Sequence, residues 1–109
     1  MTDTVVKSIP KAFLLFLAGS CLFALSCTAP PEGNGSDGAR WFAMQHCNGC
    51  HGKDGAGGRA PEIRGVGLSY GELQAKVRNS GSAIMPSYSS ERLSDKEIAD
   101  IFVFLEEVK

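Results

Sequence analysis

The pattern of apolar and polar positions predicts a helix at the C-terminal end of the chain. Apolar residues recur at helical spacing from Ile98 to Leu105, with polar residues between them. Ser94 and Glu97 precede this run with the S-x-x-E spacing of a capping box, in which each side chain bonds the backbone N–H of the other residue. We therefore expect a helix that follows Ser94 and continues to the end of the chain.

Two further helices are expected upstream. Ser69 and Glu72 form a second capping box and predict a helix over residues 70–79. A helix over residues 38–46 is expected from the apolar side chains in that segment, with Asp37 as its N-cap. The segment between these helices is too rich in glycine for regular structure. The chain is predicted to be all-α, with three main helices and long loops.

The N-terminal segment has the pattern of an export signal. Lys7 and Lys11 are followed by an uncharged apolar run from Ala12 to Leu25. As a helix this run would span about 21 Å, which is shorter than the ~30 Å hydrocarbon core of a bilayer. Residues 1–26 are therefore predicted to be a leader that directs the protein out of the cytoplasm.

Cys27 opens a flexible linker of residues 27–37 that is rich in proline, glycine and serine. A cysteine directly after the apolar run resembles a bacterial lipoprotein processing site, which makes Cys27 a candidate lipid anchor. Ordinary cleavage of the leader, or a retained leader that acts as the anchor, are the alternatives. The remaining residues, 38–109, are expected to form one domain.

Composition excludes one class of partner and suggests a cofactor. The net charge is −1 and no basic stripe stands out, so no nucleic-acid partner is expected. A domain of this length builds only a thin protein core. Its long glycine-rich loops therefore suggest that a bound group fills its centre.

Residues 46–52, "HCNGCHG", are the candidate chemistry of the chain. A structural zinc site needs four ligands, and no second ligand pair accompanies Cys47 and Cys50. A thioredoxin-like dithiol would follow a strand, and none is predicted here. A plain disulfide is chemically possible in an oxidising compartment but would not explain the loops. His46 directly precedes Cys47, which places it at the edge of any attached group, and we interpret it as a bystander.

The fourth interpretation is covalent haem attachment, the usual meaning of C-x-x-C-H. The thiols of Cys47 and Cys50 would form thioethers with the haem, and His51 would be an axial ligand of the iron. Met85 is the expected second axial ligand, because it lies in a Ser/Gly/Pro-rich loop where core packing is unusual. Met44 precedes the cysteines on the same helix and could not reach the opposite face of the haem.

Four ordered segments resemble class I c-type cytochromes, in particular the small bacterial monohaem kind. They cover residues 38–108 and read "GARWFAMQHCNGCHG", "APEIRG", "VRNSGSAIMPSYSS" and "LSDKEIADIFVFL". The resemblance implies a small cytochrome c fold wrapped around one covalent haem c. It also implies that the carbonyl of Pro61 accepts a hydrogen bond from the haem-ligating His51.

The same resemblance implies further roles. Gly38 or Ala39, with Phe42, would mark the crossing of the first and last helices, and the partner aromatic would be Phe102 or Phe104. Tyr88 and Arg78 match positions near the haem edge.

These features predict a protein of electron transport rather than an enzyme. We expect a one-electron carrier with His/Met axial ligation and therefore no substrate at the iron. Its partners would be redox proteins that donate and accept electrons in the cell envelope. It would lie in the periplasm or on the outer side of the cytoplasmic membrane, with a membrane tether through its N-terminus as one option. The alternatives are a dedicated haem-bearing subunit of a larger oxidoreductase and a haem gas sensor or weak peroxidase.

Overall fold

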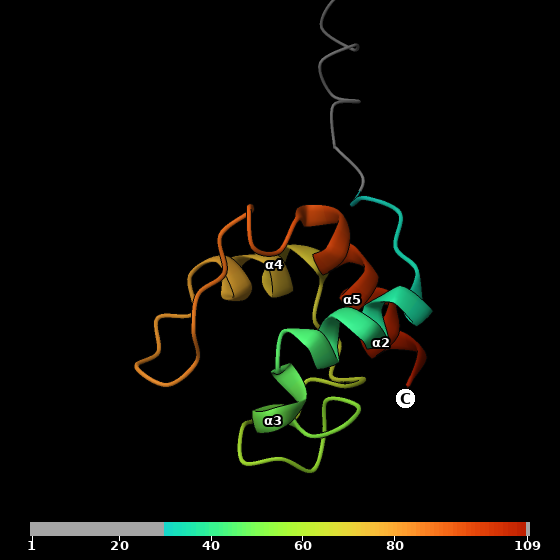
Figure 1. Cartoon of the computed structure of the whole chain (residues 1–109). Helices are drawn as coiled ribbons and strands as arrows, with labels where there is room; N and C mark the ends of the chain where they lie inside the picture. The colour runs from blue at the N-terminus through green and yellow to red at the C-terminus, as the bar shows by residue number, and fades with distance from the viewer. Residues whose placement is uncertain (1–29, 109) are drawn as a thin grey trace, which may run out of the picture.

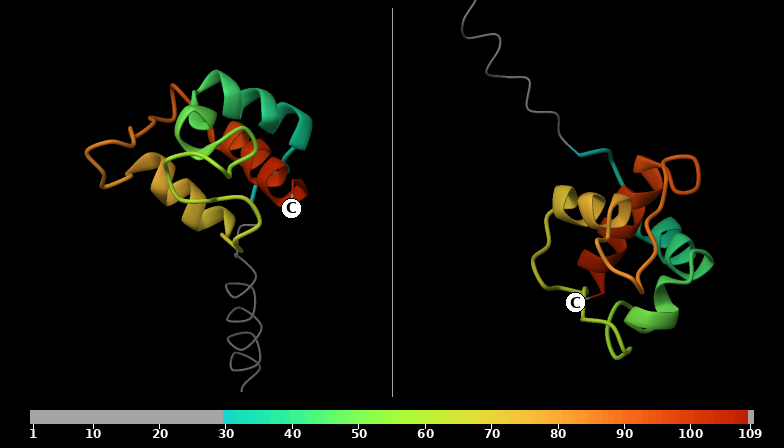
Figure 2. Two further views of the ribbon diagram at one scale, coloured as in Figure 1. Left: turned by 90° about the horizontal axis from the view of Figure 1, so that it is seen from below. Right: turned by 90° about the vertical axis from the view of Figure 1, so that its left-hand side faces the viewer.

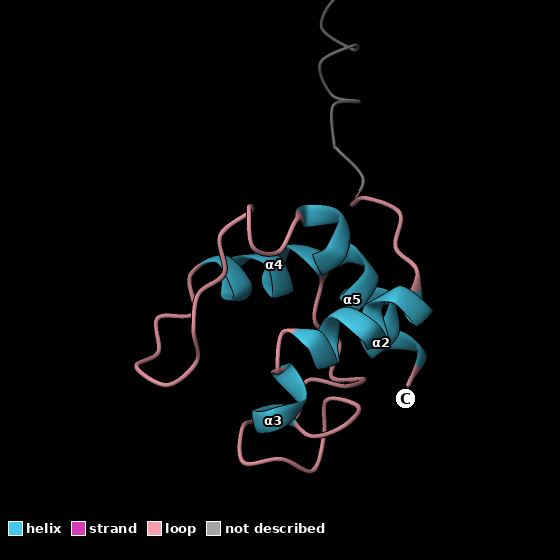
Figure 3. Cartoon of the chain, viewed as in Figure 1, coloured by secondary structure: helices cyan, strands magenta, loops and turns pink. Residues whose placement is uncertain are grey.

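The computed structural model describes residues 30–108, and within them the fold is all-α, as predicted (Figure 3). The expected leader and the first three residues of the linker, 27–29, lie outside the described residues, and so does the candidate anchor Cys27. Among the described helices none is long and apolar enough to cross a membrane. The described helices are α2 (Gly35–Met44), α3 (Cys47–His51), α4 (Tyr70–Arg78) and α5 (Asp95–Glu107).

Both predicted capping boxes are confirmed. The hydroxyl of Ser69 accepts from the Glu72 N–H at 3.2 Å, and the Glu72 carboxylate accepts from the Ser69 N–H at 2.8 Å. Ser94 and Glu97 repeat this pair of bonds with the same two distances at the start of α5. Each box satisfies backbone donors that the first turn of a helix leaves without partners. The starts of α4 and α5 are therefore fixed by local sequence.

The start predicted for the first helix was wrong. Helix α2 begins at Gly35, and its N-cap is Asn34 rather than Asp37. The Asn34 side chain accepts from the backbone N–H of Asp37 at 3.1 Å, so Asp37 lies in the first turn. Asn34 also donates its own N–H to the carboxylate of Asp100 at 2.7 Å. A contact with α5 thus extends the helix into the segment that was expected to be linker.

The end predicted for that helix was also wrong. Helix α2 ends at Met44, two residues before the expected end at His46. His46 has a φ of 62°, a left-handed conformation that is uncommon for residues other than glycine. This conformation reverses the chain and allows α3 to begin at Cys47 as a separate short helix. The CxxCH segment is therefore a helical turn of its own.

Helices α2 and α5 cross closely and form the centre of the fold (Figure 1). Gly38 makes the approach possible, because a Cβ atom there would lie 2.0 Å from the carbonyl oxygen of Asp100. One turn further on, the rings of Phe42 and Phe104 lie 5.6 Å apart, which is an ordinary aromatic pair distance. Of the alternatives offered by the sequence, the crossing uses Gly38 and Phe104. Phe102 instead contacts Tyr70 of α4.

The buried core gathers around α5 and joins all parts of the described domain. Its fully buried members include Phe42, Leu93 and Ile98, and Cys47 packs against it from α3. Two loops leave this core without regular structure, residues 52–69 and residues 79–93. Figure 2 shows them on different sides of the helices, the first running from α3 and the second from α4. These loops carry the remaining predicted site residues.

Candidate functional site

The two cysteines of the motif lie on one face of α3. Cys47 and Cys50 lie three positions apart in a helix, so their side chains are neighbours on its surface. Both are free thiols; Cys50 is exposed and Cys47 is half-buried against the core. Burial raises the pKa of the Cys47 thiol to about 11, so this thiol carries its proton at neutral pH. The turn presents two free thiols side by side.

His51 ends α3, and one of its two ring nitrogens is already bonded. Its Nδ1 lies 2.8 Å from the carbonyl oxygen of Pro61. A carbonyl only accepts, so Nδ1 carries the hydrogen and donates it. The neutral ring then has its lone pair on Nε2, the form in which histidine binds a metal. The structure thus brings Pro61 to His51 in the geometry that the cytochrome resemblance implies.

The loop after α3 folds back tightly to bring Pro61 into reach. The backbone N–H of Ala60 donates to the Cys50 carbonyl at 2.9 Å. Gly58 lies so close to the same carbonyl that a Cβ atom would be 2.0 Å from its oxygen. Gly52 has a φ of 87°, which turns the chain out of α3. The glycine-rich sequence after the motif therefore permits the return that places Pro61 against the His51 ring.

Met85 lies on the other loop, where hydrogen bonds hold its backbone. Its N–H donates to the Ser82 hydroxyl at 3.1 Å, and its carbonyl accepts from the Ser80 hydroxyl at 2.7 Å. Met85 is half-buried, while the neighbouring Ile84 is 88% exposed. Met85 and His51 are carried by different parts of the chain: His51 ends helix α3, and Met85 lies in the loop between α4 and α5.

Tyr88 connects the Met85 loop to the start of the motif. Its hydroxyl donates to the carbonyl oxygen of Gln45 at 3.0 Å, two residues before Cys47. Burial, and then the nearby Cys47 thiol, raise the pKa of Tyr88, which keeps this hydroxyl protonated as a donor. The Arg92 guanidinium covers the Tyr88 ring, 4.7 Å from its centroid. Tyr88 therefore sets where the Met85 loop sits relative to α3.

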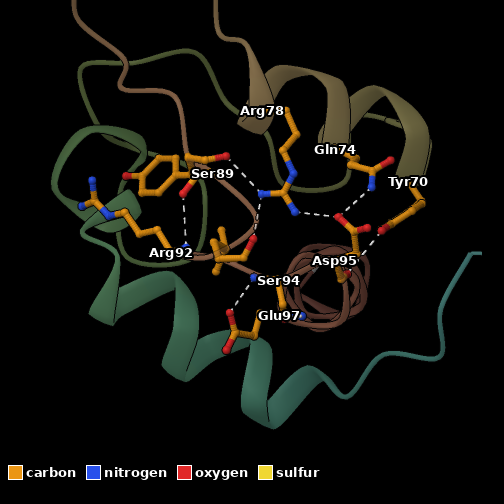
Figure 4. A network of polar contacts seen from close by, with 10 residues as sticks. Tyr70, Gln74, Arg78, Ser89, Arg92, Ser94, Asp95 and Glu97 are labelled. Atoms are coloured by element: carbon orange, nitrogen blue, oxygen red, sulfur yellow. Dashed lines mark hydrogen bonds and ion pairs between the residues drawn. The ribbon is translucent and has the colours of Figure 1, made fainter.

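Arg78, at the end of α4, is at the centre of a polar network (Figure 4). Its Nη1 donates to the carbonyl oxygens of Tyr88 and Leu93, at 3.1 and 2.7 Å. Its Nη2 lies 2.6 Å from the carboxylate of Asp95 on α5. The guanidinium, and then the amide of Gln74, hold the pKa of Asp95 below its usual range. Arg78 is thus bonded to the protein's own backbone and to α5.

Sequence reasoning missed Ser80 and Gln45, which contact the segments that carry the predicted ligands. Ser80 is buried, and its hydroxyl is the donor to Met85. Gln45 offers only its backbone oxygen to Tyr88. A serine directly after the predicted helix of residues 70–79 is the only signal in the sequence for Ser80. Gln45 leaves no such signal, because any residue type can offer a backbone carbonyl. His46 is exposed and bonds no other site residue through its side chain.

The donor set fits a haem bound through two thioethers better than it fits a lone ion. Within residues 30–108, no group of three or more His, Cys, Asp and Glu side chains could hold a metal ion. The motif instead offers two adjacent thiols and an imidazole whose Nε2 is free to bind iron, and Met85 offers a soft thioether sulfur.

Comparison with known proteins gives one match. The family model described as "Cytochrome C oxidase, cbb3-type, subunit III" matches residues 33–105. The match begins just before the cap of α2, ends within α5 and includes every predicted site residue. No curated protein and no solved structure is similar enough to match.

Proposed function

This chain belongs to the family of cbb3-type cytochrome c oxidase subunit III, and from that membership we propose that it is a one-electron carrier with His51 and Met85 as axial ligands of its haem iron. A covalently bound haem c is the cofactor of this family, and Cys47 and Cys50 fit its attachment. When bound, the haem supplies an iron that gains or loses one electron, with no change in its covalent bonds. The chain's own residues attach the haem, ligate its iron and orient the His51 ring.

The observation that carries the proposal is the geometry of α3. Each thiol would add across one vinyl group of the haem, its sulfur bonding one carbon and its hydrogen passing to the other. This addition needs no oxidant and has no leaving group. His51 follows Cys50 directly, so its imidazole is the residue that would hold the iron once both thiols are attached. Pro61 holds the ring in the tautomer that has its lone pair on Nε2.

Met85 supports His/Met ligation by its chemistry and its place. A thioether is a soft ligand that favours ferrous iron and raises the reduction potential, which suits a carrier. Both axial positions are then filled by protein, so no substrate reaches the iron and no residue acts as a catalyst. Electrons pass to and from other redox proteins by contact. The predicted leader over residues 1–26 supports a location in the cell envelope, with Cys27 as the candidate lipid anchor.

A second function is favoured by the description of the matched family. Its name is that of an oxidase subunit, so this chain would deliver electrons within one larger complex rather than shuttle between several. The two functions use the same haem and the same ligands. Purification from envelope membranes separates them: constant recovery with one oxidase supports the subunit, and recovery as a free chain supports the carrier.

The attachment claim is tested by replacing both motif cysteines. In the double variant Cys47→Ala/Cys50→Ala, we expect acid–acetone to extract all haem, because no thioether remains to hold it. We also expect a large loss of folded protein by circular dichroism, since the thin core depends on the attached group. Absorbance of the protein pellet after extraction measures the first effect.

Cys27→Ala is the matched control, because it removes a cysteine outside the motif. This variant should retain all haem after extraction. Haem that stays covalently bound in the double variant would contradict the attachment through Cys47 and Cys50.

A further inference from the structure

The loop that carries Met85 is closed on itself by hydrogen bonds between its two legs. The backbone N–H of Tyr88 donates to the Val77 carbonyl at 2.8 Å, which brings the ends of residues 78–87 together. Nearer the tip, the Ser80 N–H donates to the Ser87 hydroxyl at 3.1 Å, and the Ser80 hydroxyl donates to the Met85 carbonyl. A loop whose ends meet in this way is a compact surface unit of the Ω type.

The closure depends on one charged side chain at the base of the loop. The Nη1 atom of Arg78 has two hydrogens, and both have acceptors: the Tyr88 carbonyl and the Leu93 carbonyl. Hydrogen bonds from a charged donor are about twice as strong as those between neutral groups. Leu93 is 1% exposed and belongs to the core. Arg78 therefore fastens the returning leg of the loop to α4 and to the core at once.

The third partner of Arg78 links the same base to another helix. Asp95 is the first residue of α5, and its carboxylate binds Nη2. The Arg78 side chain is 24% exposed and the Asp95 side chain 55%, so water partly screens this pair, and its role here is to fix geometry rather than to add much stability. Figure 4 shows the guanidinium between α4, the returning leg and the start of α5. The Arg78 side chain thus fixes the relative positions of α4, the returning leg of the loop and the start of α5.

We propose that Arg78 is a positioning residue for Met85: it holds the loop so that the thioether stays within reach of the iron. The proposal rests on the proposed function. The resemblance to c-type cytochromes placed Arg78 near the haem edge, but both Nη1 hydrogens and one on Nη2 are engaged by the chain itself. Arg78 therefore acts on the ligand through the backbone that carries it. When the base of the loop loosens, Met85 leaves the iron more often, and an added ligand competes more successfully.

Arg78→Lys and Arg78→Gln in the holoprotein test this role, with imidazole as the added ligand. Lysine keeps the charge, but its three donors sit on one nitrogen, so it lacks the planar fork with which Arg78 reaches two carbonyls and Asp95. We expect imidazole to bind ferric Arg78→Lys about tenfold more tightly than the unmodified protein, a change that corresponds to about 1.4 kcal/mol. Arg78→Gln should show a larger change. In both variants, the Met-to-iron charge-transfer band should disappear at a lower pH than it does in the unmodified protein.

Arg40→Lys is the matched control. Arg40 also pairs with an aspartate, Asp37, but its side chain is 60% exposed on α2, away from the loop. Its variant should bind imidazole within about twofold of the unmodified protein, since exposed pairs contribute little.

The outcomes separate this proposal from the proposed function. Unchanged imidazole binding and an unchanged band in both Arg78 variants would overturn the role of Arg78 and leave the ligation intact. Loss of helical circular dichroism in both variants would also overturn it, because Arg78 would then support the whole fold rather than the loop. A Met-to-iron band that is absent from the unmodified protein would contradict the proposed ligation itself.

Discussion

His51 and Met85 differ in how the chain holds them. The His51 ring is oriented by a bond from its own Nδ1 to the Pro61 carbonyl. Met85 is held through its backbone, by Ser80 and Ser82, and its side chain takes no part in those bonds. A change of the Met85 side chain therefore leaves the hydrogen bonds of the loop in place, which makes it a clean test of ligation.

In Met85→Ala the loop should keep its shape while the thioether is lost. We expect the reduction potential to fall, because the ligand that favours ferrous iron is gone. We also expect imidazole or cyanide to bind at least roughly tenfold more tightly, since no protein ligand competes for that position. Potentiometry and optical titration measure these changes.

Met44→Ala is the control for this prediction. Met44 is 57% exposed at the end of α2 and is also a methionine near the motif. Its replacement should change neither the potential nor the binding of added ligands. A Met85→Ala protein with an unaltered spectrum would show that Met85 is not a ligand.

Asp100 is a buried carboxylate whose charge should make stability depend on pH. Burial acts to raise its pKa, but bonds from Lys96, the Asn34 N–H and Trp41 outweigh it, so the pKa is lowered from 3.8. A lowered pKa in the folded state means that the stabilisation is fully present above pH 3.8. It is lost as the pH falls through the lower value of the folded protein.

Asp100→Asn should therefore reduce the free energy of unfolding by about 1 kcal/mol at pH 7, the usual size for a hydrogen-bonded polar group. The difference from the unmodified protein should shrink as the pH falls below 3.8. Denaturant unfolding of the holoprotein at a series of pH values measures this difference. Glu91→Gln, at an exposed position, is the control. A difference that is constant with pH would contradict the role of the Asp100 charge.

At the level of single residues, the sequence identified the types of side chain but few of their partners. The C-x-x-C-H spacing is local, so Cys47, Cys50 and His51 could be found from it directly. Pro61 was found through the family resemblance alone. The acceptors of Arg78 lie 10 and 15 residues further along the chain, and no local pattern predicts such a contact.

At the level of elements, the helices with local start signals could be predicted and the others could not. Capping boxes placed the starts of α4 and α5 correctly because their bonds lie within four consecutive residues. The start of α2 was missed because Asn34 is fixed partly by Asp100, far along the chain. The break before α3 was missed because the left-handed His46 has no sequence signal, whereas a glycine there would have suggested one.

The crossing of α2 and α5 should be sensitive to any side chain at Gly38. In Gly38→Ala the new Cβ would lie 2.0 Å from the Asp100 carbonyl oxygen, so the helices must separate. We expect a loss of about 1–3 kcal/mol in the free energy of unfolding, as for other overpacked cores. Denaturant unfolding of the haem protein measures it.

Gly71→Ala is the matched control, because Gly71 is also helical but has open space around its missing Cβ. Alanine favours the helix over glycine, so this variant should gain about 0.4–1 kcal/mol. Equal effects at the two positions would show that helix propensity matters here and that the close approach does not.

At the level of the whole molecule, the loop that carries Met85 is fastened to the helices, and His51 is carried by helix α3. Tyr88 bonds Gln45 at the junction of α2 and α3, and Arg78 fastens the same returning leg to α4 and α5. The all-α class followed from helix periodicity, while this arrangement of loops depends on distant contacts. In this arrangement different segments of the chain hold His51 and Met85, as a group bound between the two residues would require.

The most direct test of the central claim is a spectroelectrochemical titration of the purified full-length holoprotein under carbon monoxide. We predict a single reversible one-electron transition, a Met-to-iron band in the ferric form, and no carbon monoxide adduct in the ferrous form, since both axial positions are filled. Carbon monoxide binding to the ferrous protein, or a ferric spectrum without the methionine band, would contradict electron transfer through a haem held by His51 and Met85.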